Sequence, residues 1–132
     1  MSQENVEIMR ALFDMWNAGD MDAFRELYDP DAIARAPKDW PEPGPFVGRE
    51  AIMREWDQLR EWASASQVLE PISDFIDHAD HVVVRQIWRG VGLGPDTNLE
   101  LTNVVTVRRG KVIYQEFFWD HDEALETLGL SE

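Results

Sequence analysis

The sequence predicts an α+β fold in which helices come first and a curved, mostly antiparallel sheet follows. In the first half, apolar residues recur every three or four positions, as they do on one face of a helix. In the second half, alternating apolar runs are separated by short turns, as in hairpin strands. No linker, repeat or low-complexity tract divides the 132 residues, so we expect one domain spanning residues 1–132.

Three helices are predicted before the main run of strands. The first covers residues 3–18, and Gly19 suits its end because glycine adopts a positive φ at little cost. Asp20 can cap a second helix over residues 21–28, and residues 49–62 form the third. The apolar stripes of the first and third helices consist of Val6, Met9, Phe13, Trp16, Ile52, Trp56 and Leu59.

The segment between the second and third helices reads as a turn, a short strand and a loop. Residues 29–31 have the Asp-Pro-Asp pattern of a turn, and residues 31–37 alternate weakly, as a short strand would. Several prolines and glycines make residues 38–48 a loop, because proline removes backbone donors. Trp40 and Phe46 in this loop suggest a lid or rim over a pocket.

The second half predicts four strands and a short final helix. The strands cover residues 68–77, 81–91, 99–108 and 111–119. Arg109-Gly110 forms a tight hairpin turn, and the glycines at 90–94 form a hairpin loop because no helix follows them. Residues 77–81, Asp-His-Ala-Asp-His, are a solvated turn rather than a metal site, since one short turn rarely presents three converging ligands.

Composition narrows the possible partners. The net charge is −14, and a polyanion repels phosphate backbones and anionic lipids, so we expect neither nucleic acid nor membrane as a partner. The absence of cysteine excludes disulfides and thiolate chemistry. No signal peptide or long apolar run is present, so we expect a cytoplasmic protein. The six tryptophans are many for this length and favour a pocket or an interface.

Motifs along nearly the whole chain resemble the nuclear transport factor two-like superfamily, and in particular its SnoaL-like branch. The matching segments are residues 17–24, 28–32, 46–52, 109–112 and 118–130. The resemblance implies a cone-shaped, cystatin-like α+β barrel, with the sheet wrapped around the N-terminal helices and a pocket open at one end. It also implies a homodimer. Apolar residues on both faces of the strands at 82–88 and 101–107 agree with this, because an uncovered face needs a partner.

For function, the resemblance implies binding of a small apolar molecule without a cofactor or a metal. One reading is a cofactor-free cyclase, isomerase or hydrolase that uses a carboxylate as acid and base. The alternative is a non-catalytic ligand-binding or accessory dimerisation domain. Fold alone does not choose between them. The catalytic positions of the ketosteroid isomerases correspond to Leu12, Ala36 and Asn103 here, so that set is not preserved. Those of the epoxide hydrolases fall near Gln86, Trp88 and either Phe117 or Asp120, so that set is largely missing.

Three residues are the candidates for catalysis. Asp120 is similar in position to the late aspartate of SnoaL-type cyclases, and the resemblance implies that it is the acid and base, but Asp120-x-x-Glu123 is also the pattern of a helix N-cap. Asn103 could polarise a substrate carbonyl or satisfy a neighbouring backbone group. Arg35 could hold an anionic oxygen or neutralise acidic neighbours at the surface. The predicted ligand-binding residues, which would line the pocket with Asn103, are Trp16, Trp40, Trp56, Trp88 and Phe118.

Overall fold

The computed structural model of the protein describes residues 2–63, 67–90 and 98–129. In chain order the elements are α1 (Ser2–Ala18), α2 (Met21–Glu26), β1 (Tyr28–Arg35), β2 (Phe46–Val47), α3 (Arg49–Trp62), β3 (Val68–Pro71), β4 (Ile76–His78), β5 (His81–Arg89), β6 (Asn98–Arg108), β7 (Lys111–Phe118) and α4 (His121–Thr127). The predicted α+β class is confirmed.

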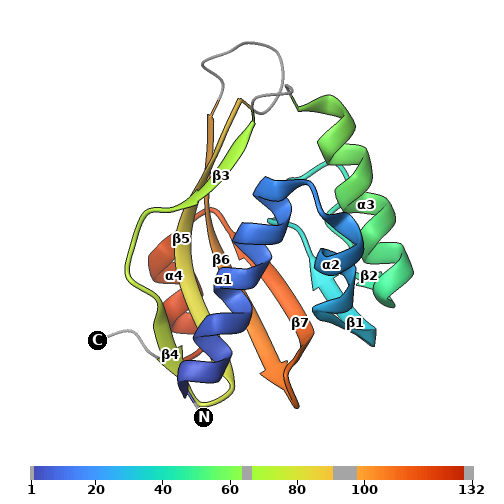
Figure 1. Cartoon of the computed structure of the whole chain (residues 1–132). Helices are drawn as coiled ribbons and strands as arrows, with labels where there is room; N and C mark the ends of the chain where they lie inside the picture. Colours follow the sequence, from blue (N-terminus) through green and yellow to red (C-terminus); the bar gives the residue numbers. More distant parts are fainter. Residues whose placement is uncertain (1, 64–66, 91–97, 130–132) are drawn as a thin grey trace.

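The strands form one curved sheet that is not closed into a barrel. Its order is β2-β1-β7-β6-β5-β3, and β4 also pairs with β5. Of these pairs, β1–β7 is parallel and the others are antiparallel. Helices α1, α2 and α3 lie on one face of the sheet, whereas α4 packs behind it (Figure 1). We call the face toward α1, α2 and α3 the inner face and the other the outer face.

Local signals explain where the helices begin and end. Gly19 has a φ of 75° and closes α1. The Asp20 carboxylate then accepts a hydrogen bond from the Ala23 backbone N–H at 3.1 Å, which caps α2. Helix α3 follows Gly48, whose φ of 92° is a conformation that residues with a Cβ rarely adopt. The predicted ends of α3 are confirmed, since both glycine and the amphipathic stripe act locally.

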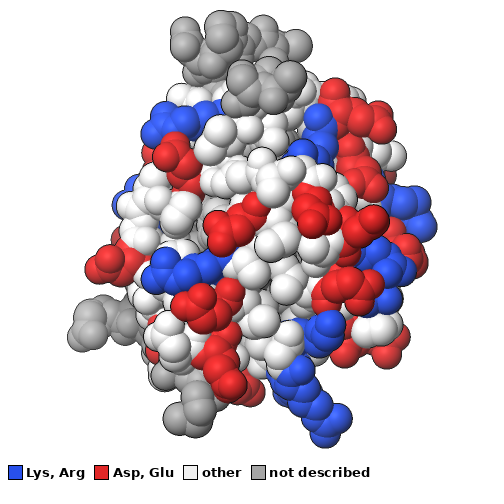
Figure 2. Space-filling model, in the orientation of Figure 1, with Lys and Arg blue, Asp and Glu red and all other residues white. Residues whose placement is uncertain are grey.

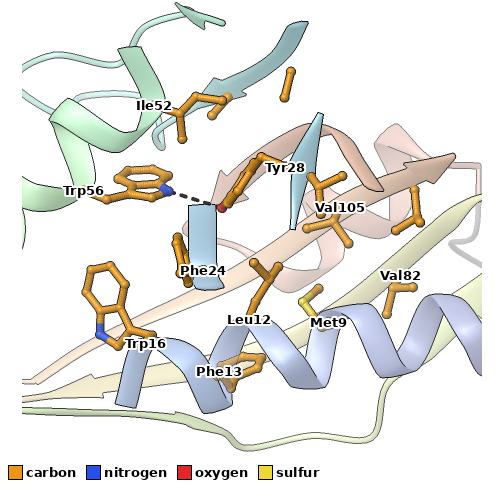
Figure 3. Packing of buried hydrophobic residues seen from close by; sticks show 14 of the residues in the cluster. Met9, Leu12, Phe13, Trp16, Phe24, Tyr28, Ile52, Trp56, Val82 and Val105 are labelled. Atoms are coloured by element: carbon orange, nitrogen blue, oxygen red, sulfur yellow. Dashed lines mark hydrogen bonds between the residues drawn. The ribbon is translucent and has the colours of Figure 1, made fainter. Parts of the chain in front are cut away.

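The hydrophobic core lies between the helices and the inner face of the sheet. Apolar side chains of α1, α2 and α3 point toward those of β5 and β6, with Tyr28 of β1 among them (Figure 3). The core residues with the largest side chains are Met9, Leu12, Phe13, Trp16, Phe24, Tyr28, Ile52, Met53, Trp56 and Trp88. Successive strand residues point to opposite faces, so Val82 and Val84 join this core and Val83 does not.

The outer face has a smaller apolar cluster of its own. Val83 and Val104 pack against Ala124 of α4, with Phe118 and Leu125 at the margin. Helix α4 therefore covers these valines within the same chain, and their apolar character does not by itself require a second subunit. The homodimer stays a prediction.

Two predicted boundaries were wrong because pairing with distant strands decided them. Strand β1 begins at Tyr28, where we expected the end of a helix and a turn, because Tyr28 pairs with Val112 of β7. The predicted strand over residues 68–77 is two strands, β3 and β4, which pair with opposite ends of β5. The predicted glycine loop at 90–94 falls almost entirely outside the described residues.

The predicted loop at 38–48 contains a two-residue strand. Its end folds back onto β1, where Val47 pairs with Ile33 and Phe46 with Ala34. The Ala36 N–H also bonds to the Pro43 carbonyl at 2.9 Å. A strand of two residues has no periodicity, so its sequence gave no indication of it.

Charged side chains are scattered among uncharged ones on the surface that faces the viewer in Figure 2. Acidic groups are spread over it with basic groups between them, in keeping with the net charge of −14. Among the described residues, none of the helices combines the length and the hydrophobicity that crossing a membrane requires.

Replacing Ile52 by alanine should lower the free energy of unfolding by about 2–5 kcal/mol, because the deletion leaves a cavity in a fully buried part of the core. Urea denaturation of both proteins measures the change. Ile72→Ala removes the same atoms from a side chain that is 40% exposed and serves as the control. Equal losses in the two variants would contradict the position of the core.

Candidate functional site

A cavity opens between the helices and the inner face of the sheet. Its empty space is about 640 Å³ with the open mouth counted. The residues that line it are Leu12, Trp16, Phe24, Tyr28, Ala36, Pro37, Trp40, Trp56, Leu59, Leu69, Gln86, Trp88, Leu99, Leu101, Asn103, Gln115 and Phe117. None of these described lining residues carries a charge. The cavity therefore suits an apolar molecule and has only a few polar groups with which to orient it.

Two of the predicted tryptophans form one wall of the cavity. The rings of Trp16 and Trp88 meet edge to face, with centroids 5.8 Å apart. Both indoles donate to the same side-chain oxygen of Gln67, at 2.9 Å and 2.5 Å. The guanidinium of Arg60 lies over the Trp16 ring, 4.6 Å from its centroid. The N–H groups of this wall are thus satisfied by protein, and the rings are held in place.

Trp40 brings the proline-rich loop to the cavity. Its ring lies 6.1 Å from that of Trp119, measured between centroids. The Trp119 indole in turn donates to the Lys38 carbonyl at 2.7 Å, so the loop is attached to the end of β7. Trp40 lines the cavity, and its contact with a ligand stays a prediction. Phe46 instead packs on Trp56, with centroids 6.3 Å apart, and is not among the lining residues.

A line of hydrogen-bonded polar side chains crosses the floor of the cavity. The Trp56 indole donates to the Tyr28 hydroxyl at 3.2 Å (Figure 3), and this hydroxyl donates to Gln115 Oε1 at 2.5 Å. Gln115 Nε2 donates to Asn103 Oδ1 at 3.0 Å. Asn103 Nδ2 then donates to Gln86 Oε1, also at 3.0 Å. All five side chains line the cavity and all are buried.

Of this polar line, the sequence identified Trp56 and Asn103 and missed the other three. Tyr28 was assigned to a helix, whereas it begins β1. Gln86 and Gln115 had a signal that could have been used. Each is an amide at the position in the alternation that faces the core, with apolar residues two positions away on the same face. Polar groups at such positions in three adjacent strands indicate a shared buried network.

Phe118 does not line the cavity, and its predicted place is corrected. Strand alternation turns its neighbour Phe117 inward, where it contacts Trp56 with centroids 5.7 Å apart. Phe118 points to the outer face and joins the cluster covered by α4. The sequence left this choice open because both faces of β7 carry apolar bulk.

Arg35 also lies away from the cavity. It is exposed and pairs with Glu116 across the parallel β1–β7 ladder. The Tyr114 hydroxyl donates to the same Glu116 carboxylate at 2.9 Å. Arg35 therefore lies at the surface opposite an acidic residue, Glu116. This agrees with the alternative interpretation, in which Arg35 neutralises acidic neighbours.

Asp120 caps the last helix. Its carboxylate accepts the Asp122 backbone N–H at 2.9 Å, as an N-cap residue does. It borders a separate depression together with Arg85, Glu100, Leu101, Thr102, Trp119 and His121, and it is not among the residues that line the cavity. The position supports the capping interpretation and gives no support to a role as acid and base for a molecule in the cavity.

Glu55 is a buried carboxylate that the sequence analysis did not single out. It lies on α3 beside Trp56 and is 8% exposed. Burial raises its pKa above the ordinary value of 4.5, and the nearby charge of Glu42 raises it further. Glu55 does not line the cavity, and its raised pKa predicts an effect on stability.

Comparison with known proteins agrees with this architecture. The chain has the fold of the nuclear transport factor two-like superfamily. An NTF2-like protein of unknown function from Burkholderia pseudomallei superposes with a TM-score of 0.75 at 18% identity, over 93% of this chain and 95% of the other. The model of the SnoaL-like domain family matches residues 9–115, so the chain belongs to that family. The resemblance noted from the sequence is confirmed.

Two similar structures share more of the sequence. A proposed polyketide cyclase from Sinorhizobium meliloti is 28% identical with a TM-score of 0.70, over 84% of this chain and 93% of the other. A proposed polyketide cyclase from Streptomyces antibioticus is 25% identical with a TM-score of 0.69, over 95% and 98% of the two chains. A comparison with curated proteins finds no match.

Substitution of Asp120 should separate capping from chemistry. Asp120→Ala should lower the free energy of unfolding by about 1 kcal/mol, whereas Asp120→Asn should change it little because asparagine also caps helices well. Thermal or urea unfolding measures both. Neither variant should alter the affinity of a molecule bound in the cavity. A large loss of affinity in Asp120→Asn would contradict this assignment.

Glu55→Gln should stabilise the protein at neutral pH. A carboxyl with a raised pKa in the folded state contributes stability when protonated and loses it as the pH rises through that pKa. Glutamine does not titrate, so the advantage of the variant should be present at pH 7 and disappear below about pH 4. Melting temperatures across this range measure it. Glu61→Gln, an exposed site on the same helix, is the control; an equal gain there would show that only net charge matters.

Proposed function

We propose that the protein binds a small, largely apolar molecule in the cavity between its helices and the inner face of the sheet. The observation that carries the proposal is the lining itself. It combines aromatic and aliphatic walls with one line of buried polar side chains, and no described lining residue is charged. This combination is usual for small-molecule sites, in which apolar contact supplies affinity and a few polar groups set orientation.

Membership of the SnoaL-like family supports the same conclusion. The two similar structures described as proposed polyketide cyclases are 28% and 25% identical to this chain. A molecule of the polyketide kind, flat and largely apolar, suits walls made of Trp16, Trp56 and Trp88. The proposal concerns the class of ligand and does not depend on turnover.

A cyclase-type activity is the second candidate, favoured by those two similarities. Such a reaction needs a group that polarises a carbonyl and a base that removes a proton. The amides of Gln86 and Asn103 can donate to a carbonyl oxygen. The described lining holds no carboxylate and no imidazole, however. Binding is therefore the function that the geometry supports best, with catalysis requiring a base from outside this lining.

Filling part of the cavity should weaken binding without harming the fold. Ala36 lines the cavity and is 7% exposed, so Ala36→Leu places three more carbon atoms there. We expect toluene and naphthalene, followed by ligand-observed NMR, to bind the natural protein and to bind Ala36→Leu at least about tenfold more weakly, a difference of about 1.4 kcal/mol. The melting temperature should not fall.

The matched control is Ala18→Leu at an exposed position of α1, which should bind as the natural protein does. If neither compound binds the natural protein, the proposal is wrong. Equal affinities for the natural protein and Ala36→Leu would place the site elsewhere.

A further inference from the structure

The hydrogen bonds on the cavity floor all run in one direction. An indole N–H can only donate, so the Tyr28 hydroxyl must accept from Trp56. Its single proton is then left for Gln115 Oε1. Burial raises the pKa of the Tyr28 phenol, so the proton stays on the hydroxyl. Because the Trp56 N–H can only donate, the Tyr28 hydroxyl accepts from Trp56 and donates to Gln115.

Each amide passes this direction to the next. The oxygen and the nitrogen of an amide point in different directions, so an amide whose oxygen faces one neighbour turns its nitrogen toward the other, and amide orientations are assigned from such partners. Gln115 therefore donates to Asn103, and Asn103 donates to Gln86. The last amide, that of Gln86, accepts with its oxygen and ends the line with its nitrogen.

The Gln86 side-chain nitrogen has no protein partner among the described residues. It donates in none of the hydrogen bonds among the described residues, where only the Gln86 oxygen has a partner. It is also not one of the fully buried side-chain atoms without a partner, so it is accessible. Gln86 lines the cavity and is 4% exposed overall, so this nitrogen opens onto the cavity. The strand neighbours on this face, Val84 and Trp88, offer no acceptor. A molecule that fills the cavity must accept from this nitrogen or leave a buried donor unpaired.

From this geometry we infer that the cavity selects an uncharged ring compound bearing a carbonyl oxygen, which accepts a hydrogen bond from Gln86 Nε2. The inference rests on the proposed function and names its ligand class. A carbonyl accepts without bringing a proton of its own that would need a partner. A carboxylate is disfavoured because the described lining offers no cation and burying an unpaired charge is costly.

Acetophenone and α-methylstyrene test the inference. The two compounds have the same carbon skeleton except that α-methylstyrene has a C=CH₂ group where acetophenone has C=O. Their affinities are measured by NMR titration of the ¹⁵N-labelled protein, whose side-chain amide signals include that of Gln86. Because the alkene is the more apolar molecule, the decisive quantity is the ratio of the two affinities in different variants rather than either affinity alone.

Gln86→Met keeps the length of the side chain and places a methyl group where the nitrogen was. The ratio of acetophenone affinity to α-methylstyrene affinity should fall about tenfold in this variant, the value of one net hydrogen bond. In the natural protein, acetophenone should move a Gln86 side-chain amide proton downfield, as a new hydrogen bond does, whereas α-methylstyrene, which has the same ring but no acceptor, should not produce this downfield change. This second measurement decides the matter even if Gln86→Met does not fold.

Gln58→Met, at an exposed amide of α3 that does not line the cavity, is the matched control. It should affect both compounds alike. An unchanged ratio in Gln86→Met, with both compounds bound, would overturn the inference and leave the proposed function standing. No binding of either compound to the natural protein would overturn both. Benzoate should bind more weakly than acetophenone, and tighter binding of benzoate would show that the site prefers an anion.

Discussion

The buried hydroxyl of Tyr28 is the interaction on which the rest of the site depends. It joins the indole of α3 to the amides of the sheet in a core that is otherwise apolar. An unpaired polar group in such a core costs about 1–3 kcal/mol, so each member of the line needs the next one. This requirement ties α3 to β1 and β7 more specifically than apolar contact does, and it places a set of oriented amides along the floor of the cavity.

Because strand residues alternate in direction, the inner face of the sheet carries the cavity and the outer face packs against α4. On β7, Gln115 and Phe117 face the cavity, and Phe118 faces α4. A shift of one residue in the register would exchange these roles. The same rule explains why Asp120 ends beyond the cavity: it follows the strand and begins a helix that covers the opposite face.

The cavity is an exception within a well-packed core, and its walls show how it persists. Trp16 and Trp88 are held by hydrogen bonds to one amide outside the cavity, and Trp40 is held through Trp119. Rigid rings held by such hydrogen bonds or ring contacts cannot readily collapse into the empty space. The large negative charge of the chain lies elsewhere, on the surface, and the described lining remains neutral. An unfilled cavity lowers the free energy of unfolding, and here that loss occurs at a place suited to binding.

Much of the fold could be predicted from the sequence because the signals are local. Amphipathic spacing and glycines determined α1 and α3, alternation determined β5, β6 and β7, and Asp120 carried the pattern of a cap. Of the residues that line the cavity, the sequence identified four tryptophans and Asn103. Large aromatic residues and an amide in the middle of an apolar strand stand out in the sequence. It placed Phe118, Arg35 and Asp120 in the same site, which the structure separates from the cavity.

What only the tertiary structure decided was which residues meet. The partners of Tyr28 are 28 and 87 positions away along the chain, and no local pattern records such a pairing. The split of residues 68–77 into two strands and the strand at Phe46–Val47 also depend on distant neighbours. The sequence by itself determined most of the elements, the tryptophans of the pocket and the family. The direction of the hydrogen bonds on the cavity floor was decided by the fold, because an amide acquires a donor end and an acceptor end only when its partners are in place.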